Sequence, residues 1–311
     1  DNPPQLAGSQ RWAFGAGNPP QLADSQRWAF GALPRGGRGG DTLRAMSPSA
    51  PELTGPVFVA ESSDVLYDAL ASRLYQAAVG AVKERGAFHL ALSGGSTPEP
   101  FYIRLMIDSR YRTLPWSSTH IWLVDERHVP LTDDRSNWKM ITECIIEQVP
   151  TPRRQTHPVP VRSSDPASEY ESELKAAFAA YSVPPLATWP EDRTPRLDFV
   201  LLGMGDDGHT ASLFPGSDAI AVEDRLIALN AGDAVTPPPR ITMAYPLLNA
   251  ARDVAVLVTG QKKAAAVQRV QQAVIGQDKL DPNVLPIVGI DPKPAGGKLT
   301  WYLDEAAATP V

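Results

Sequence analysis

Short apolar runs alternate with amphipathic stretches along the chain from about residue 55 onward. Each run holds four to seven mostly apolar residues with turn-forming or charged residues beside it, which is typical of buried strands. The predicted strands are residues 57–60, 88–92, 120–124, 197–202, 241–245, 253–259, 286–290 and 299–303. The run that ends at Leu202 is typical of a strand buried on both faces of a sheet.

Between these runs, apolar residues recur at the spacing of one helix face. The first helix is predicted to begin near Ser62, a residue type that caps helices, and further helices are expected at 98–108, 137–148, 165–180, 262–274 and 305–308. Strands that alternate with helices predict an α/β fold with a mainly parallel sheet and helices on both faces. In such sheets, ligands bind at the carboxyl ends of the strands.

The first 53 residues have a different character. Residues 2–16 return at 18–32 with one difference, Gly8 in the first copy and Asp24 in the second. A solenoid needs about three or more repeats, so this duplication does not predict one. We expect residues 1–53 to be a flexible Pro/Gly-rich tail and 54–311 to form a single α/β domain. Trp12 and Trp28 leave open that the tail is a docking peptide.

Composition excludes several classes of protein. The 311 residues carry a net charge of −6, which argues against binding to nucleic acid or to an anionic membrane. The single cysteine, Cys144, excludes an internal disulfide framework and a multi-cysteine zinc site. No apolar run approaches the ~20 residues that span a bilayer, and no signal peptide is evident. We expect a cytoplasmic monomer or weak homo-oligomer.

Residues 92–98, Leu-Ser-Gly-Gly-Ser-Thr-Pro, form the first of three unusual segments that follow predicted strands. Gly94 and Gly95 let the backbone approach a ligand, Ser96 and Thr97 offer hydroxyls, and the following helix start offers free N–H groups. These are the requirements of a phosphate site, although a tight turn with a helix cap fits the residues equally well. Neither the dinucleotide nor the Walker fingerprint is present.

Asp125, Glu126 and Arg127 form the second segment, after the predicted strand 120–124. Arg127 can grip a phosphate with two hydrogen bonds. Asp125 or Glu126 could bind sugar hydroxyls or hold Arg127 in place. Taken by itself, the trio also fits a surface ion pair.

The third segment, residues 203–216, follows the most apolar strand and contains Gly203, Gly205 and Gly208. Asp207 and His209 lie two residues apart, so both side chains can face one cavity. A carboxylate that fixes the tautomer of an imidazole makes the histidine an effective general base. A structural histidine and a metal site are the alternatives, but the spacing matches no common metal motif, and we expect no metal.

Together, these segments resemble the 6-phosphogluconolactonase family. The resemblance also includes residues 128–130, 136–137, 239–242, 247–251 and 260–264, and it covers about residues 55–306 in order. The related glucosamine-6-phosphate deaminases share several of these motifs, but they have Ile-Ala-Phe-Asn-Glu-Pro after the histidine. Here residues 210–215 read Thr-Ala-Ser-Leu-Phe-Pro, the lactonase form. The resemblance implies a three-layer α/β/α sandwich, a sugar-phosphate lactone as substrate and no cofactor.

The resemblance also assigns roles. His209 is expected to activate water for attack on the lactone carbonyl, with Asp207 orienting it, and no nucleophile elbow is present that would suggest a covalent route. The expected phosphate and substrate contacts are Gly94, Gly95, Ser96, Thr97, Asp125, Arg127, Arg240 and Lys263, with Lys262 as the alternative to Lys263.

Two other functions stay open. One is the deaminase activity of the same superfamily. The other is a non-catalytic sugar-phosphate sensor, which would need a DNA-binding helix-turn-helix that residues 1–53 are too rich in Pro and Gly to form.

Overall fold

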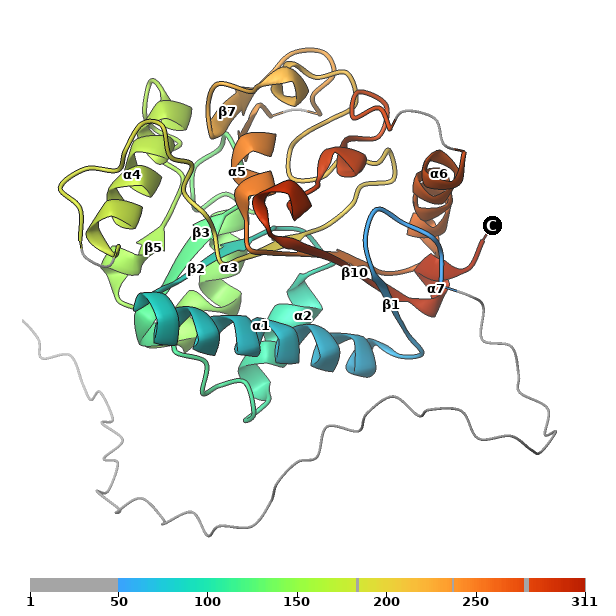
Figure 1. The fold of residues 1–311 in the computed structure, drawn as a ribbon, viewed down its shortest axis with the longest axis horizontal. Helices are drawn as coiled ribbons and strands as arrows, with labels where there is room; N and C mark the ends of the chain where they lie inside the picture. Colours follow the sequence, from blue (N-terminus) through green and yellow to red (C-terminus); the bar gives the residue numbers. More distant parts are fainter. Residues whose placement is uncertain (1–49, 183–184, 237, 277–279, 311) are drawn as a thin grey trace, which may run out of the picture. The chain divides into compact units, whose positions relative to one another are not determined.

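A parallel sheet forms the centre of the molecule. The structure is a computed structural model that describes residues 50–182, 185–236, 238–276 and 280–310. Within these residues, seven strands form a sheet in the order β1-β10-β9-β6-β2-β3-β5, and every neighbouring pair is parallel (Figure 1). They are β1 (Val57–Ala60), β2 (Phe88–Leu92), β3 (Thr119–Leu123), β5 (Thr156–His157), β6 (Phe199–Leu202), β9 (Asp253–Val258) and β10 (Lys298–Asp304).

Helices cover both faces of this sheet. They are α1 (Ser63–Arg85), α2 (Glu99–Ile107), α3 (Asn137–Cys144), α4 (Pro166–Ala180), α5 (Tyr245–Ala250), α6 (Ala264–Ile275) and α7 (Glu305–Ala308). Because parallel strands are joined by right-handed crossovers, the strand order places α1, α2 and α3 on one face and α4, α5 and α6 on the other (Figure 1). The expected three-layer α/β/α architecture is confirmed. The central strands β2, β3, β6 and β9 are buried along their whole length.

The first helix shows how the sequence sets local structure. The Ser62 hydroxyl accepts a hydrogen bond from the Val65 backbone N–H at 3.3 Å, as the predicted cap requires. At the other end, Gly86 adopts a left-handed conformation with φ 79°, and its N–H donates to the Val82 carbonyl. Between these ends, Leu66, Leu70 and other apolar residues at helical spacing are fully buried against the sheet.

A second, antiparallel sheet was not expected. It consists of β4 (Asp125–Arg127), β8 (Arg240–Met243) and β7 (Ile227–Asn230) in the order β4-β8-β7. The predicted strand at 241–245 therefore exists, but it lies outside the main sheet. The segment 125–127, which we expected to be a loop, is a strand whose register places Arg127 directly opposite Arg240.

The prediction of a strand at residues 286–290 is wrong. Pro286–Gly289 forms a turn of 3₁₀ helix, with Ile287 and Val288 buried. The Pro286 carbonyl accepts a hydrogen bond from the Tyr245 hydroxyl at 2.6 Å, so a side chain from α5 holds this turn in place. Four buried apolar residues in a row do not by themselves distinguish a strand from a helical turn.

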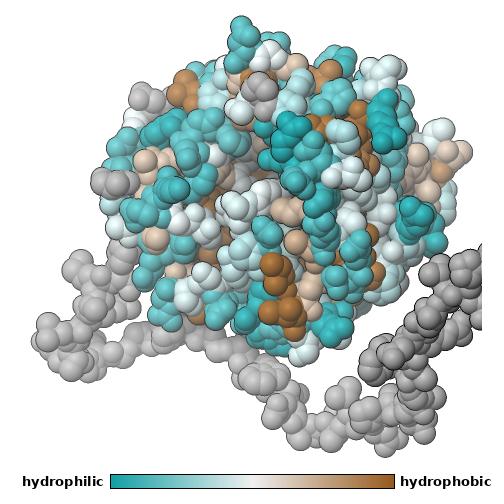
Figure 2. Space-filling model, turned by 180° about the vertical axis from the view of Figure 1, so that it is seen from behind, coloured by the Kyte–Doolittle hydropathy of each residue, from teal (hydrophilic) through white to brown (hydrophobic). Residues whose placement is uncertain are grey.

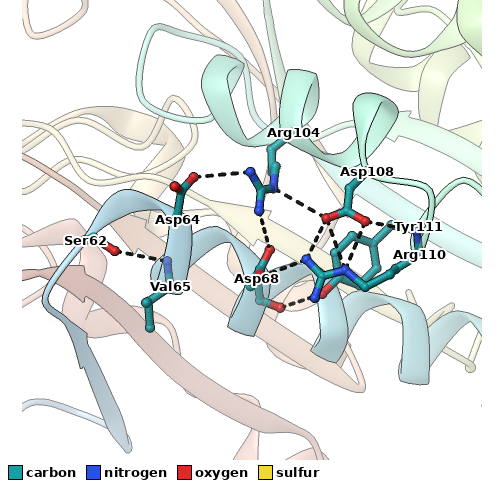
Figure 3. Close-up of polar contacts among 8 residues, drawn as sticks. All are labelled: Ser62, Asp64, Val65, Asp68, Arg104, Asp108, Arg110 and Tyr111. Atoms are coloured by element: carbon teal, nitrogen blue, oxygen red, sulfur yellow. Dashed lines mark hydrogen bonds and ion pairs between the residues drawn. The ribbon is translucent and has the colours of Figure 1, made fainter.

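Charged side chains join α1 to α2 and to the turn that follows it (Figure 3). Arg104 contacts Asp64 at 3.2 Å and Asp68 at 3.1 Å, and Arg110 contacts Asp68 at 2.9 Å and Asp108 at 2.6 Å. The hydrogen bonds from Arg110 hold the pKa of Asp108 at about 2. Exposed ion pairs of this kind stabilise a protein little one by one, so we regard the cluster as fixing the angle between the two helices.

On the face shown in Figure 2, apolar side chains lie in small groups among polar ones. The large apolar residues that are exposed are Val65, Val79, Ile103, Ile107, Leu229, Ile275 and Val284. In the described part of the chain, none of the helices has the length and apolar character needed to cross a membrane.

The described chain packs on the domain before the predicted boundary at residue 54. Pro51 is buried, and Leu53 is 7% exposed and belongs to the hydrophobic core. The Thr54 hydroxyl accepts a hydrogen bond from the Trp301 indole N–H at 3.2 Å. The duplicated segment lies outside the described residues, so the flexible tail stays a prediction.

Deletion of residues 1–49 is therefore expected to leave the melting temperature unchanged, because residues of that composition contribute no core. Leu53→Ala, in contrast, is expected to lower the free energy of unfolding by about 2–5 kcal/mol, the usual cost of truncating a buried leucine. Melting curves and urea denaturation of both variants, compared with the unmodified chain, check the two predictions. A deletion as destabilising as Leu53→Ala would mean that the tail packs on the domain.

Candidate active site

Four neighbouring strands direct their following segments to one cavity. In the sheet order β9-β6-β2-β3, each of these strands ends at the same edge, and the segments after them supply the cavity wall. The cavity has a volume of about 320 Å³. Its lining includes nine of the ten residues predicted for the site: Gly94, Gly95, Ser96, Thr97, Asp125, Arg127, His209, Arg240 and Lys263. The tenth, Asp207, contacts His209.

His209 and Asp207 form a hydrogen-bonded pair. The His209 Nδ1 lies 2.6 Å from Asp207 Oδ1, and the His209 backbone N–H donates to the same oxygen at 3.0 Å. Since the carboxylate can only accept, Nδ1 carries the hydrogen and Nε2 keeps its lone pair. Burial by itself raises the pKa of Asp207, but the hydrogen bonds from His209 outweigh it and hold that pKa at about 2. The carboxylate therefore stays charged at neutral pH.

Glycine makes this pair possible. A Cβ on Gly205 would lie 2.1 Å from His209 Nδ1 and 2.7 Å from Asp207 Oδ1, so no other residue fits there. Gly208 has φ +88°, in the region that favours glycine, and its N–H donates to the Gly205 carbonyl at 3.0 Å. The Gly205 N–H in turn donates to the His209 carbonyl at 2.8 Å. The loop is thus closed on itself around His209 and Asp207.

Ala211 has a positive φ of 51°, the only such non-glycine residue in the described chain. It lines the cavity two residues after His209. Left-handed backbone costs energy for alanine, and such conformations concentrate at functional sites. The aromatic ring of Phe214 packs against the His209 imidazole with ring centroids 4.7 Å apart.

Lys263 lies at the end of the segment after β9 and pairs with the loop that carries His209. Its Nζ is 2.7 Å from Asp206 Oδ1. Arg269, on α6, donates hydrogen bonds to the backbone carbonyls of Asp206 and Asp207 at 3.3 and 3.1 Å. The helix therefore holds the loop from one side, and Lys263, not Lys262, is the lysine that lines the cavity.

Arg127 and Arg240 carry positive charge that no carboxylate neutralises among the described ion pairs. The Arg240 guanidinium donates to the carbonyls of Pro238 and Thr236 at 3.0 and 3.2 Å. It also lies over the Phe214 ring at 5.6 Å. Burial lowers the pKa of Arg240 from its ordinary value, and the nearby charge of Asp125 opposes this shift. The Arg127 guanidinium donates to the Arg135 carbonyl at 2.5 Å.

The glycine-rich segment after β2 completes the cavity. Gly95 has φ +100°, and Gly94 lies so close to Asn137 that a Cβ would meet its Oδ1 at 1.9 Å. Ser96 is exposed and Thr97 half-buried at the start of α2, where backbone N–H groups lack helical partners. The structure thus brings free N–H groups and hydroxyls to the cavity that also holds Arg127 and Arg240.

The two acidic residues of the second segment have separate roles. Asp125 lines the cavity and accepts hydrogen bonds from the Ser212 hydroxyl at 2.6 Å and from Asn137 Nδ2 at 3.3 Å. Glu126 is fully buried and accepts four hydrogen bonds, including those from the backbone N–H groups of Asn137 and Trp138 at 2.8 Å. Burial raises the pKa of Glu126, opposed by these bonds. Glu126 therefore fixes the start of α3 and does not face the cavity.

Several cavity residues were not predicted from the sequence as contacts: Ser93, Asn137, Met204, Ala211, Phe214 and Thr236. Asn137 belongs to a motif of the family resemblance, residues 136–137, and that motif could have indicated it as a contact. Thr236 had no such signal, because it lies in an irregular segment outside the predicted motifs. Among the described residues, no three His, Cys, Asp or Glu side chains are grouped so that they could hold a metal ion.

The sequence of this chain is similar to the sequences of several known proteins. The 6-phosphogluconolactonase of Synechocystis sp. is 38% identical over 230 residues, which make up 73% of this chain and 86% of that protein. The GDH/6PGL endoplasmic bifunctional protein of Oryctolagus cuniculus is 39% identical over 244 residues, 78% of this chain. That match spans only 29% of the bifunctional protein's length.

Solved structures of two 6-phosphogluconolactonases are similar to this one in fold. The 6-phosphogluconolactonase of Leishmania guyanensis has a TM-score of 0.67 and 26% identity, over 82% of this chain and 97% of that one. The enzyme of Thermotoga maritima has a TM-score of 0.63 and 26% identity, over 81% of this chain and 100% of that one. The family described as glucosamine-6-phosphate isomerases/6-phosphogluconolactonase matches residues 61–301. The chain therefore belongs to the glucosamine-6-phosphate isomerase/6-phosphogluconolactonase family.

Proposed function

We propose that the chain hydrolyses 6-phospho-D-glucono-1,5-lactone to 6-phosphogluconate, a step of the oxidative pentose phosphate pathway. The observation that carries the proposal is one cavity that holds both an imidazole oriented by a carboxylate and two arginines, Arg127 and Arg240, that form none of the described ion pairs. Relatives of this chain that cover most of its length are named for this activity. A phosphate on the substrate supplies an anion for Arg127 and Arg240, and the lactone carbonyl is the group that an activated water can attack.

The phosphate is bound by Arg127, Arg240 and Lys263, together with the hydroxyls and N–H groups of residues 94–97. Charge-assisted hydrogen bonds to these groups anchor the dianion and place the lactone ring near His209. Lys263 exchanges its contact with Asp206 for one with the phosphate. Asp125 lies where it can accept a hydrogen bond from a sugar hydroxyl.

The chemical step follows from the tautomer of His209. Its Nε2 takes a proton from a water molecule as the water oxygen forms a bond to C1 of the lactone. The imidazolium that results is stabilised by Asp207, which stays ionised and keeps the ring in place. When the bond between C1 and the ring oxygen breaks, the imidazolium returns its proton to that oxygen. The products are 6-phosphogluconate and the original form of the enzyme, without a cofactor.

The assay generates the lactone in place with glucose-6-phosphate dehydrogenase and follows its disappearance with and without the chain. The proposal predicts a faster loss of lactone in proportion to the amount of chain added. A rate equal to that of spontaneous opening contradicts it. Incubation with glucosamine 6-phosphate is the parallel test of deaminase activity, and we expect no release of ammonia.

We further propose that the chain acts in the cytoplasm as a monomer or weak homo-oligomer, without nucleic acid or membrane.

His209→Ala is expected to lower kcat by about 10²–10⁴-fold, the usual contribution of general-base catalysis. His209→Asn is expected to be nearly as slow, because an amide accepts a hydrogen bond but no proton at neutral pH. Asp207→Asn removes only the orientation of the ring, so its loss of kcat should be smaller. Steady-state kinetics of the three variants, each with a melting curve, check this. A folded His209→Ala with more than about a tenth of the original kcat would exclude His209 as the base.

Arg127→Ala is expected to raise KM for the phosphorylated lactone by about tenfold to a hundredfold, because a charge-assisted hydrogen bond contributes ~1.5–3 kcal/mol. Arg225→Ala is the matched control, since Arg225 is exposed and pairs only with Asp224 among the described ion pairs. Unphosphorylated gluconolactone should be a poor substrate for all three proteins. Equal kcat/KM for the two lactones in the unmodified chain would refute the phosphate site.

A further inference from the structure

A second cavity lies at the opposite edge of the main sheet, at the amino ends of the strands. Its volume is about 430 Å³, larger than that of the candidate active site. His89 lies near the start of β2, Asp198 directly precedes β6, and Arg252 directly precedes β9. The catalytic segments follow the other ends of these same strands. The cavity is therefore separate from the candidate active site, and the proposed reaction makes no use of it.

The floor of this cavity is aromatic. The His89 imidazole stacks on the Phe178 ring with centroids 3.9 Å apart and planes 22° from parallel. Trp189 meets Phe178 edge-on at 5.6 Å. The Trp122 indole N–H donates to His89 Nδ1 at 3.3 Å, so the hydrogen of the neutral imidazole is on Nε2. Burial lowers the pKa of His89 well below its ordinary value, which keeps the ring neutral. His120 also stacks on His89, with ring centroids 4.5 Å apart, so Phe178 and Trp189 are the aromatic side chains of the floor that a flat ligand ring can pack against.

The rim is cationic in a chain whose net charge is −6. Four arginines line the cavity, Arg85, Arg193, Arg196 and Arg252, against the two carboxylates of Glu84 and Asp198. Both carboxylates are already engaged. Glu84 pairs with Arg85 at 2.6 Å, and Asp198 pairs with Arg85 at 2.9 Å and Arg252 at 3.4 Å.

Arg193 and Arg196 are the two arginines left over. Arg193 lies over the Trp189 ring at 4.7 Å, and Arg196 Nε donates to the Ala250 carbonyl at 2.8 Å. Neither has a carboxylate partner among the described ion pairs, so both guanidinium groups keep donors for an anion. An uncharged apolar ligand would leave this charge unused, and a bare phosphate would leave the aromatic floor uncovered.

We propose that the cavity at the amino edge binds a small organic anion built on a flat ring, with the ring against Phe178 and Trp189 and the acid group on Arg193 and Arg196. A cavity of this size is within the range of small-molecule sites, about 300–1,000 Å³. Both a nucleoside monophosphate and an aromatic carboxylate have this chemistry, and competition distinguishes them.

The probe is 8-anilinonaphthalene-1-sulfonate, a fluorescent ring system that carries one permanent negative charge. Titration into the full chain is expected to show one saturable site. Arg193→Ala and Arg196→Ala should each weaken binding by about tenfold or more, the loss of one charge-assisted hydrogen bond. Arg225→Ala is the control outside the cavity and should bind as tightly as the unmodified chain. The uncharged N-phenyl-1-naphthylamine should bind about tenfold more weakly than the sulfonate.

Arg196 also holds the Ala250 carbonyl, so Arg196→Lys is the second variant, and every variant is compared by its melting curve. Adenosine 5′-monophosphate and benzoate are then added as competitors. The one that displaces the probe at the lower concentration shows whether the ligand is a nucleoside monophosphate or an aromatic carboxylate. Saturating 6-phosphogluconate should leave the probe bound. Displacement by 6-phosphogluconate, equal affinity in folded Arg193→Ala and Arg196→Lys, or equal binding of the neutral ring system would each overturn the proposal.

Discussion

The parallel direction of the main sheet is the constraint on which the rest of the structure depends. When all strands of a sheet run the same way, every carboxyl end lies at one edge and every amino end at the other. Segments that are up to 170 residues apart in sequence, such as the glycine-rich loop at Gly94 and the lysine at 263, thereby line a single cavity. The opposite edge gathers a different set of residues, with arginines and aromatic rings. One backbone arrangement thus produces two chemically distinct cavities.

Within the candidate active site, the carboxylate that holds His209 and the two arginines of the cavity come from separate elements. The loop after β6 carries the carboxylate that orients His209, closed tightly around Gly205. The small antiparallel sheet carries Arg127 and Arg240 in facing positions. Both guanidinium groups donate to backbone carbonyls and form none of the described ion pairs, so an anion that binds them would break no ion pair of theirs. Lys263 differs from them, since it already contacts Asp206.

Sequence patterns predicted the main sheet and most of the candidate site, but they missed what depends on contacts between distant segments. The residues of β4 are Asp-Glu-Arg, which show no apolar alternation, so nothing in the sequence indicated a strand there. They pair because residues 240–242 lie beside them. The run at 286–290 has the composition of a strand, but a side chain from α5 holds it as a helical turn. The amino-edge cavity had no sequence signal, because its lining residues come from unconnected loops and helix ends.

The central claim is that His209 acts through Nε2, with Nδ1–H held by Asp207. The most direct measurement is the long-range ¹⁵N–¹H spectrum of the histidine rings, which is tractable because the chain has five histidines. At neutral to slightly alkaline pH, the account predicts the Nδ1–H tautomer for His209 and a change in its Nε2 resonance when 6-phosphogluconate binds. An Nε2–H tautomer, or an Nε2 resonance that does not move when the site is saturated, would contradict the account.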